Sequence, residues 1–370
     1  MADSSSTPGI PAARALALWQ AAREAGGCPA RLPAVRVPLA EAAGLVTARP
    51  VWAGRSSPPF DAAAMDGIAV RAADTAGASQ DAPVLLGPGG YDVVDTGDPM
   101  PAGCDAVVMR EHVRYLNGAA ELRAAVPPYR HVRSIGEDVS AGELLLPEGC
   151  RLRAVDLAAA AAGGATTLQV HRRPVVAILP TGDEVRPAGT QTGPGEILDT
   201  NSLMLAAQAR EAGCEAHALP IEPDDPAGLA RAVSAAVASC DLLIIVAGAG
   251  AGRDDHTAGV VSRLGTLAVH GVAMRPGHPV VLGVVGGTPV LGAPGYPVAA
   301  ALAFDIFAWP LLAELEEAAP PSRPRARARL AQGLSSRPGR DEWVRVRLGV
   351  VGGTMVATPL TQSSVTPTHP

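Results

Sequence analysis

Arg173-Pro174-Val175-Val176-Ala177-Ile178-Leu179-Pro180 is the stretch that decides the fold class of this chain. Its run from Pro174 to Leu179 carries no polar residue, which is typical of a strand buried on both faces of a parallel sheet. A second run of this kind, Leu242-Leu243-Ile244-Ile245-Val246, follows later in the chain. Strands and helices are predicted to alternate around these two runs. This order indicates an α/β layered domain over residues 173–318.

Apolar periodicity and turn residues predict the remaining elements of this domain. Asn201 is expected to cap a helix that Gly213 ends. The expected helices cover residues 201–212, 226–239, 256–264 and 298–316, and the further expected strands cover residues 215–221, 269–274, 279–284 and 289–292.

The rest of the chain follows other patterns. Residues 11–25 have apolar positions at helical spacing and predict an amphipathic helix. Residues 34–150 hold short apolar runs between Gly, Pro and Asp turns, which indicates a β-rich region. An Ala-rich helix is expected over residues 153–163. Beyond a Pro-rich linker at 318–324, the pattern predicts only short strands, near 325–332, 342–348 and 354–358.

Composition excludes several classes of protein. A chain of 370 residues predicts two to four domains. The five cysteines are scattered without a CxxC pair, which argues against a zinc site or a disulfide framework. The net charge of −6 and dispersed basic residues do not suggest nucleic-acid binding. No long uninterrupted apolar run indicates a membrane span, and no signal peptide is visible, so a cytoplasmic location is expected.

All 30 basic residues are arginines. The absence of lysine excludes Schiff-base chemistry and a P-loop lysine. The sequence also lacks a nucleophile elbow, an HExxH motif and a GxxxxGK[ST] motif.

Three loops are expected at the carboxyl edge of the predicted sheet, where open α/β sheets bind ligands. They are Thr181-Gly182-Asp183-Glu184, the Gly-rich segment 247–256 and Gly292-Ala293-Pro294-Gly295-Tyr296-Pro297. Gly-rich loops before helix N-termini suit phosphate, and carboxylates at the same edge suit Mg²⁺. The alternative is that these loops are tight turns with helix caps.

Two further segments carry candidate polar groups. In Pro58–Gly67, Asp61 and Asp66 lie five residues apart without strand or helix periodicity, which fits either a ligand loop or a pair of turns. In Arg275-Pro276-Gly277-His278-Pro279, two cationic side chains share one stiff loop and would suit a phosphate or another oxyanion.

Seven segments, in order, resemble the molybdopterin molybdenumtransferase family (MoeA and the corresponding domain of gephyrin). The resemblance covers residues 11 to 358, nearly the whole chain. The segments are PPFDAAAMDGIAV (58–70), TGDPMPAGCDAVVMRE (96–111), RSIGEDVSAGELLLPEG (133–149), RPVVAILPTGDEV (173–185), GEILDTN (195–201), MRPGHPVVLG (274–283) and GAPGYPVAA (292–300). The Ala-Gly-rich loop and the GYP triplet look most like a subgroup often fused to a periplasmic-binding-protein-like domain, an extension that is not expected here.

The resemblance implies a multidomain α/β protein in four parts. These are an extended helical and strand region (1–45 and 150–172), a β-rich inserted domain (46–149), a three-layer molybdopterin-binding α/β domain (173–318) and a short, incomplete C-terminal β-barrel (325–370). It implies a homodimer whose cleft is shared between subunits. It also implies a molybdoenzyme or an upstream adenylyltransferase as a protein partner.

The implied reaction is insertion of molybdate into adenylylated molybdopterin with release of AMP, and it depends on Mg²⁺. By motif position, the resemblance assigns catalytic roles to Asp61, Asp138, Glu184 and Asp255. It assigns Mg²⁺ to Asp224, Glu184 and Asp255. It assigns substrate binding to Thr96, Thr181, Gly182, Asp183, Gly248, Gly250, Gly252, Arg275, His278, Pro294, Gly295 and Pro297.

The sequence departs from the family pattern in four places. Ala62 and Ala63 replace an Asn-Ser pair, the Gly-rich loop 247–252 lacks its serine, Arg275 and His278 replace two lysines, and the closing C-terminal strands are missing. Lost hydroxyls remove hydrogen bonds worth about 0.5–1.5 kcal/mol each. These departures motivate an alternative, a catalytically weakened carrier of molybdopterin or molybdenum cofactor. An assembly scaffold of the gephyrin kind is a third hypothesis.

Overall fold

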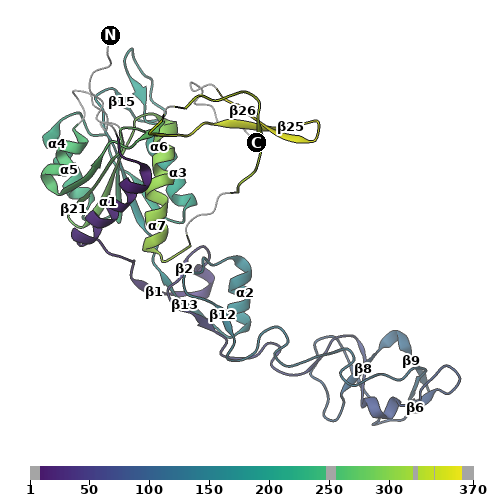
Figure 1. Ribbon diagram of the computed structural model, residues 1–370. Coiled ribbons are helices and arrows are strands. Elements are labelled where there is room, and N and C mark those ends of the chain that lie inside the picture. The colour runs from purple at the N-terminus through teal and green to yellow at the C-terminus, as the bar shows by residue number, and fades with distance from the viewer. Residues whose placement is uncertain (1–8, 247–255, 320–323, 337, 361–370) are drawn as a thin grey trace. The chain divides into compact units, whose positions relative to one another are not determined.

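The computed structural model describes residues 9–246, 256–319, 324–336 and 338–360 (Figure 1). The chain divides into two compact units. The first comprises Met1–Ala34 with His171–Pro370, and the second comprises Val35–Val170.

A six-stranded sheet is the centre of the first unit. Its strands, in spatial order, are β17 (Glu215–Ala218), β14 (Val175–Pro180), β18 (Leu242–Val246), β22 (Thr288–Ala293), β21 (Val281–Val285) and β19 (Thr266–His270). The first four run parallel, and β21 runs antiparallel to both of its neighbours. The two continuous apolar runs of the sequence are the adjacent inner strands β14 and β18, which confirms the α/β class.

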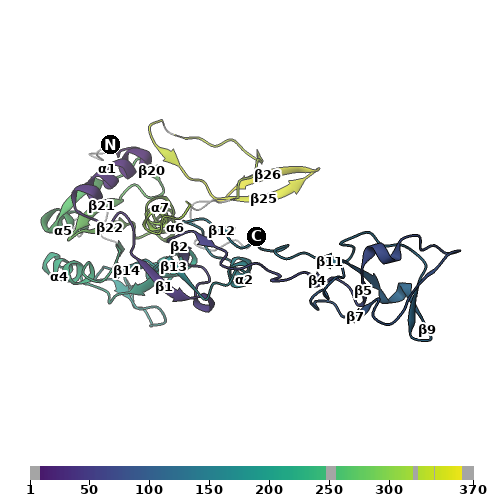
Figure 2. The same ribbon diagram turned by 90° about the horizontal axis from the view of Figure 1, so that it is seen from below.

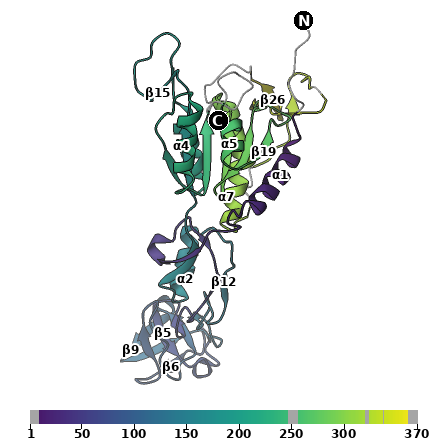
Figure 3. The same ribbon diagram turned by 90° about the vertical axis from the view of Figure 1, so that its left-hand side faces the viewer.

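Helices cover both faces of this sheet. Alternate residues of β14 point to opposite faces, so Val176 and Ile178 join one buried cluster while Ala177 and Leu179 join another. The first face is covered by α1 (Ala12–Ala25), α3 (Asn201–Glu211), α6 (Pro297–Ala303) and α7 (Trp309–Leu315), and the second by α4 (Pro226–Ala236) and α5 (Thr257–Leu264). Figures 1 and 3 show these two helical layers with the sheet between them. The first unit is therefore a three-layer α/β fold.

The stretch Pro297–Leu315 is a core helix with one irregular turn. Residues Phe304–Ala308 form a π-helical turn between α6 and α7. Pro310 is the second residue of α7, and it has no N–H to continue the regular hydrogen-bond ladder. Among the described residues this stretch is long and apolar enough to cross a membrane, but 56% of it is buried inside the protein. Phe304 and Phe307 are fully buried against the sheet, so the stretch packs as part of the unit's core.

We expect Phe307→Ala to lower the free energy of unfolding by about 3–5 kcal/mol, because it leaves a cavity in this core. Leu203→Ala, at a 67% exposed position of α3, should change it by less than about 0.5 kcal/mol. Urea unfolding followed by circular dichroism measures both. Equal losses in the two variants would contradict the assignment of Phe307 to the core.

Helix α1 also belongs to the first unit. The Trp19 indole N–H donates to the Gly283 carbonyl oxygen of β21 at 2.8 Å. Arg23 lies over the Trp19 ring and pairs with Glu314 at 2.9 Å. The predicted helix at 11–25 is thus confirmed, but it packs on the α/β sheet rather than with an extended region over 1–45. The four-part division of the chain stays a prediction.

Short strands complete the first unit. β20 (Met274–Arg275) pairs in parallel with β24 (Asp341–Glu342), which ties the region beyond the predicted linker to the loop of Arg275. β23 (Arg329–Leu330), β26 (Thr354–Pro359) and β25 (Val346–Val351) form a three-stranded sheet. Figure 2 labels β25 and β26 of this sheet. β15 (Val185–Arg186) pairs with β16 (Ile197–Leu198).

The second unit is built mainly from short strands around separate small cores. Its described elements are β1 (Ala34–Pro38), β2 (Val46–Thr47), β3 (Val51–Trp52), β4 (Ala62–Ala63), β5 (Gly67–Val70), β6 (Val84–Leu86), β7 (Asp92–Val94), β8 (Ala106–Met109), β9 (Val113–Leu116), β10 (Ala119–Leu122), β11 (Val132–Arg133), β12 (Leu144–Leu146), α2 (Ala154–Ala162) and β13 (Thr167–His171). One core joins β3, β12, β13 and α2, and another joins β5, β8 and β10. The β-rich pattern expected over residues 34–150 is confirmed.

Three local predictions are wrong. Asn201 is the first helical residue of α3 and Thr200 precedes it at the cap position. The strand expected at 269–274 ends at His270, because Gly271 takes a positive φ of 89° that breaks the extended run. The segment 58–67 is not wholly a loop, since Ala62–Ala63 form β4 and pair with Val132 and Arg133.

Candidate functional site

The loop after β14 brings Glu184 against the edge of the sheet. Thr181 is buried and bonds through both its backbone N–H and its hydroxyl to the Val246 carbonyl oxygen, at 3.0 and 3.2 Å. Gly182 follows with φ 139°. A Cβ on Gly182 would lie 2.8 Å from the Glu184 carboxylate and 2.6 Å from the Val185 side chain, so only glycine fits. The glycine thereby allows an exposed carboxylate to fold back over the strand end.

Asp183 and Asp224 join this loop to the one after β17. The Asp183 N–H donates to the Asp224 carboxylate at 3.3 Å, and the Asp224 N–H donates to the Asp183 carboxylate at 3.2 Å. The Gly182 N–H also donates to the Glu222 carbonyl oxygen at 3.1 Å. The sequence placed these carboxylates in separate segments, and the fold brings them to one edge.

The oxygen donors at this edge are of the chemical type that Mg²⁺ prefers. Among the described residues, no group of three or more His, Cys, Asp and Glu side chains could hold a metal ion by itself. Mg²⁺ is commonly held by one or two carboxylates together with substrate phosphates and water. Glu184 and Asp224 can provide these one or two carboxylates.

The loop after β22 is tied to the start of α3. The Asn201 side-chain N–H donates to the Gly295 carbonyl oxygen at 2.7 Å, which fixes the turn between Pro294 and Pro297. Pro297 begins α6, where its fixed φ is favourable and its missing N–H costs nothing. Asn201 thus positions the Gly295 loop, a role that its expected capping function did not suggest.

Residues 247–255 of the predicted Gly-rich loop lie outside the described residues. They include four candidates from the sequence: Gly248, Gly250, Gly252 and Asp255.

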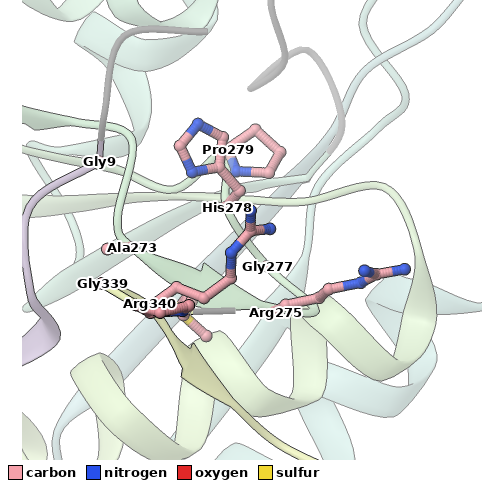
Figure 4. A pocket seen from close by; sticks show the side chains of 10 residues that line it. Gly9, Ala273, Arg275, Gly277, His278, Pro279, Gly339 and Arg340 are labelled. Carbon is pink, nitrogen blue, oxygen red and sulfur yellow. The ribbon is translucent and has the colours of Figure 1, made fainter. Parts of the chain in front are cut away.

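A basic pocket of about 560 Å³ lies beside the loop of Arg275. Arg275, His278 and Arg340 line it together (Figure 4). In Figure 4 the Arg340 guanidinium points toward the loop of Gly277 and His278. The His278 Nδ1–H donates to the Val272 carbonyl oxygen at 2.8 Å, and this leaves Nε2 for a ligand. No acidic side chain is among the described residues that line the pocket, so it suits an oxyanion.

Sequence reasoning missed Arg340. It lies in a segment that was predicted only to connect short strands. The preceding turn residues, Pro338 and Gly339, were the sole sign of a structured loop there. Pairing of β20 with β24 brings Arg340 to Arg275, 65 positions away in the chain, through contacts that no local pattern predicts.

In the second unit, the predicted acids already have partners. One oxygen of Asp61 accepts the Ile135 N–H at 2.7 Å. Asp138 receives the Arg133 guanidinium at 2.6 Å on both oxygens, and this hydrogen bonding raises the pKa of Arg133. Both carboxylates lie at the surface of the unit, so each keeps lone pairs for a ligand.

Asp66 holds Thr96 by two hydrogen bonds. The backbone N–H and the hydroxyl of Thr96 both donate to one Asp66 oxygen at 2.8 Å. Gly67 then enters β5 so close to its neighbour that a Cβ would lie 2.0 Å from the Val108 carbonyl oxygen. Asp66 therefore has a structural role beside Gly67, because its side chain holds Thr96 in place.

The backbone and side-chain hydrogen bonds of Thr96 hold the pKa of Asp66 below its ordinary value. The stabilisation from this lowered pKa is present above the ordinary carboxyl range and is lost as pH falls through the lowered value. We expect Thr96→Val to raise the pKa of Asp66 toward the ordinary value, as followed by carbon NMR of the carboxyl group. The exposed Thr354→Val should leave it unchanged. An identical Asp66 titration in Thr96→Val would contradict this account.

Comparison with known proteins gives consistent matches over most of the chain. Residues 10–164 match the family described as MoeA N-terminal region (domain I and II), and residues 177–314 match a probable molybdopterin binding domain. Molybdopterin molybdenumtransferase 2 of Mycobacterium tuberculosis is 35% identical over 349 residues, covering 87% of this chain and 85% of its own. Molybdopterin molybdenumtransferase of Nostoc is 33% identical, covering 75% and 69%.

A solved structure agrees with these matches. The crystal structure of a molybdopterin biosynthesis MoeA protein from Pyrococcus horikosii is 30% identical, with a TM-score of 0.80. The likeness covers 96% of this chain and 90% of that one.

Proposed function

This chain belongs to the molybdopterin molybdenumtransferase family, and from this premise we propose that it inserts molybdate into adenylylated molybdopterin and releases AMP. The observation that carries the proposal is the basic pocket of Arg275, His278 and Arg340. A tetrahedral oxyanion needs several fixed donors around it, and guanidinium groups supply them in a planar fork. Molybdate is such an oxyanion.

The carboxylates at the sheet edge supply the second part of the site. We propose that Glu184 and Asp224, with Asp255, hold Mg²⁺, which would neutralise charge on the substrate phosphates. Thr181, Gly182 and Asp183 shape the loop on which Glu184 lies. The substrate phosphates are expected along the Gly-rich loop of Gly248, Gly250 and Gly252.

Release of AMP requires attack by water on the phosphoanhydride. The new P–O bond forms to the water oxygen, the bond to the AMP oxygen breaks, and a carboxylate takes the water proton. Glu184 is our candidate for this base, because its carboxylate is exposed at the strand end. Pro294 and Pro297 keep the adjacent loop rigid.

We further propose that the working cleft is completed across a homodimer. Asp61, Thr96 and Asp138 belong to the second unit, and by family resemblance they face the α/β unit of a partner subunit. A cytoplasmic location and a molybdoenzyme or adenylyltransferase partner are part of the same proposal.

A reaction assembled from purified components tests the proposed activity. Purified protein with adenylylated molybdopterin, molybdate and Mg²⁺ should release AMP and form molybdenum cofactor. Omission of molybdate or Mg²⁺ gives the control. Absence of both products in the complete mixture would reject the proposed activity.

The carrier alternative rested partly on Ala62 and Ala63. Both are almost fully buried in β4, so neither position presents a side chain to a ligand. Saturable binding of molybdopterin without AMP release would favour the carrier over the enzyme.

A further inference from the structure

A second pocket, of about 570 Å³, adjoins the basic pocket and differs from it in chemistry. The two pockets share Arg275, Gly277 and Pro279 as lining residues. Apart from its arginines, the second pocket is lined mainly by aromatic, aliphatic and proline side chains. Its size falls within the usual range of about 300–1,000 Å³ for small-molecule sites.

Two aromatic side chains give this pocket flat surfaces. Tyr296 is 82% exposed, and it comes from the loop that Asn201 anchors. Trp343 is 50% exposed. Large aromatic groups left open to water, lining one cavity, are typical of surfaces on which a planar ring stacks.

The backbone around these rings is held in place before any ligand arrives. The Trp343 N–H donates to the Arg275 carbonyl oxygen at 2.8 Å, directly after the β20–β24 pairing. The Leu360 N–H donates to the Arg345 carbonyl oxygen at 2.9 Å, which fixes the segment beyond Trp343. Pro276 and Pro294 add rigid walls. A preorganised cavity of this kind binds with little ordering cost.

The charge of the pocket selects an anionic ligand. Arg275 and Arg345 line it, and none of its described lining residues is acidic. Guanidinium groups bind phosphate oxygens and stack on planar rings. Since Arg275 borders both pockets, a ligand with a ring in one can extend an anionic group toward the other.

We propose that Tyr296 and Trp343 form the binding site for a fused heteroaromatic ring that carries phosphate, and that they determine recognition of this part of the substrate. The inference rests on the proposed function, whose substrate has two such rings, adenine and pterin. To that function it adds the two residues that bind a ring of the substrate and the chemical class of that ring.

The test measures ring binding without turnover. Isothermal titration of the full-length protein uses two probes separately, AMP for the adenine arm and pterin-6-carboxylate for the pterin arm. Trp343→Ala and Tyr296→Ala should each weaken binding of the recognised probe by about tenfold or more. Trp343→Phe, which keeps a flat ring, should stay within about threefold of the unmodified protein.

Trp52→Ala is the matched control, since Trp52 is 58% exposed and belongs to the second unit. It should bind both probes like the unmodified protein, and circular dichroism verifies that every variant is folded. The probe that Trp343→Ala and Tyr296→Ala bind more weakly identifies which ring, adenine or pterin, the site recognises. Binding of neither probe, or equal affinity in Trp343→Ala and the unmodified protein, would overturn the inference.

Failure of this inference is distinguishable from failure of the proposed function. If the protein binds a probe through Trp343 but forms no molybdenum cofactor, the ring site is supported and the proposed activity is rejected. If the protein forms cofactor and Trp343→Ala has the same substrate KM as the unmodified protein, the proposed activity is supported and the ring site is rejected.

Discussion

Glu184→Gln should lower molybdate-dependent AMP release by at least about 100-fold, the usual range for loss of a general base. The amide keeps the shape of the side chain but can neither accept the water proton nor contribute negative charge for Mg²⁺. The Glu184 side chain is exposed, and the Ile197 N–H donates to the Glu184 backbone carbonyl oxygen at 2.9 Å, a bond that the substitution leaves in place. The fold and the unfolding midpoint should therefore be unchanged.

Single-turnover AMP release measures this effect. Glu211→Gln, at an exposed carboxylate near the end of α3, is the matched control and should retain full activity. Glu184→Asp should show an intermediate rate, because it keeps the charge on a shorter side chain. A rate in Glu184→Gln equal to that of the unmodified protein would remove Glu184 from the catalytic role.

Arg340→Ala should raise the KM for molybdate by about 10- to 100-fold. A hydrogen bond to a charged group contributes about 1.5–3 kcal/mol, and each 1.4 kcal/mol is a factor of ten in affinity. Arg340 lines the basic pocket with Arg275 and His278, so its loss removes one of the pocket's two guanidinium groups. Arg340→Lys should be intermediate, because ammonium keeps the charge without the planar fork.

Initial rates at varied molybdate concentration measure the KM. Arg329→Ala, at an exposed position of β23, is the matched control and should leave it unchanged. Saturating molybdate should restore most of the rate in Arg340→Ala if the residue serves binding. A molybdate KM unaffected by Arg340→Ala would exclude Arg340 from the oxyanion site.

The α/β unit was readily predicted because its sequence signals are local. β14 and β18 are uninterrupted apolar runs, and the alternation of their residues between two clusters follows from strand geometry alone. The helix near residues 298–316 was also expected, although the π-helical turn before Pro310 was not. In the second unit the β-rich character was predicted, but two-residue strands such as β4 carry too little pattern to be placed.

The candidate site was predicted in part. Glu184 and Arg275 were named from their loops and from family resemblance, and the fold brings Arg275 to His278 in one pocket. Arg340, Tyr296 and Trp343 had no assigned role, because each lies outside the regular helices and strands. β20–β24 pairing brings Arg340 and Trp343 to Arg275 from a segment far away in the chain.

The α/β class, the order of strands and helices and the family could all be deduced from the order of residues in the chain. Buried strands, turns and loop motifs depend on residues a few positions apart, so a short window of sequence is enough to predict them. Which polar groups share a site became visible only in the folded chain, as in the Asp183–Asp224 bonds, the Asp66–Thr96 bonds and the pocket of Arg275 and Arg340. These contacts arise from strand pairing and loop closure between distant segments, and no local pattern specifies that geometry.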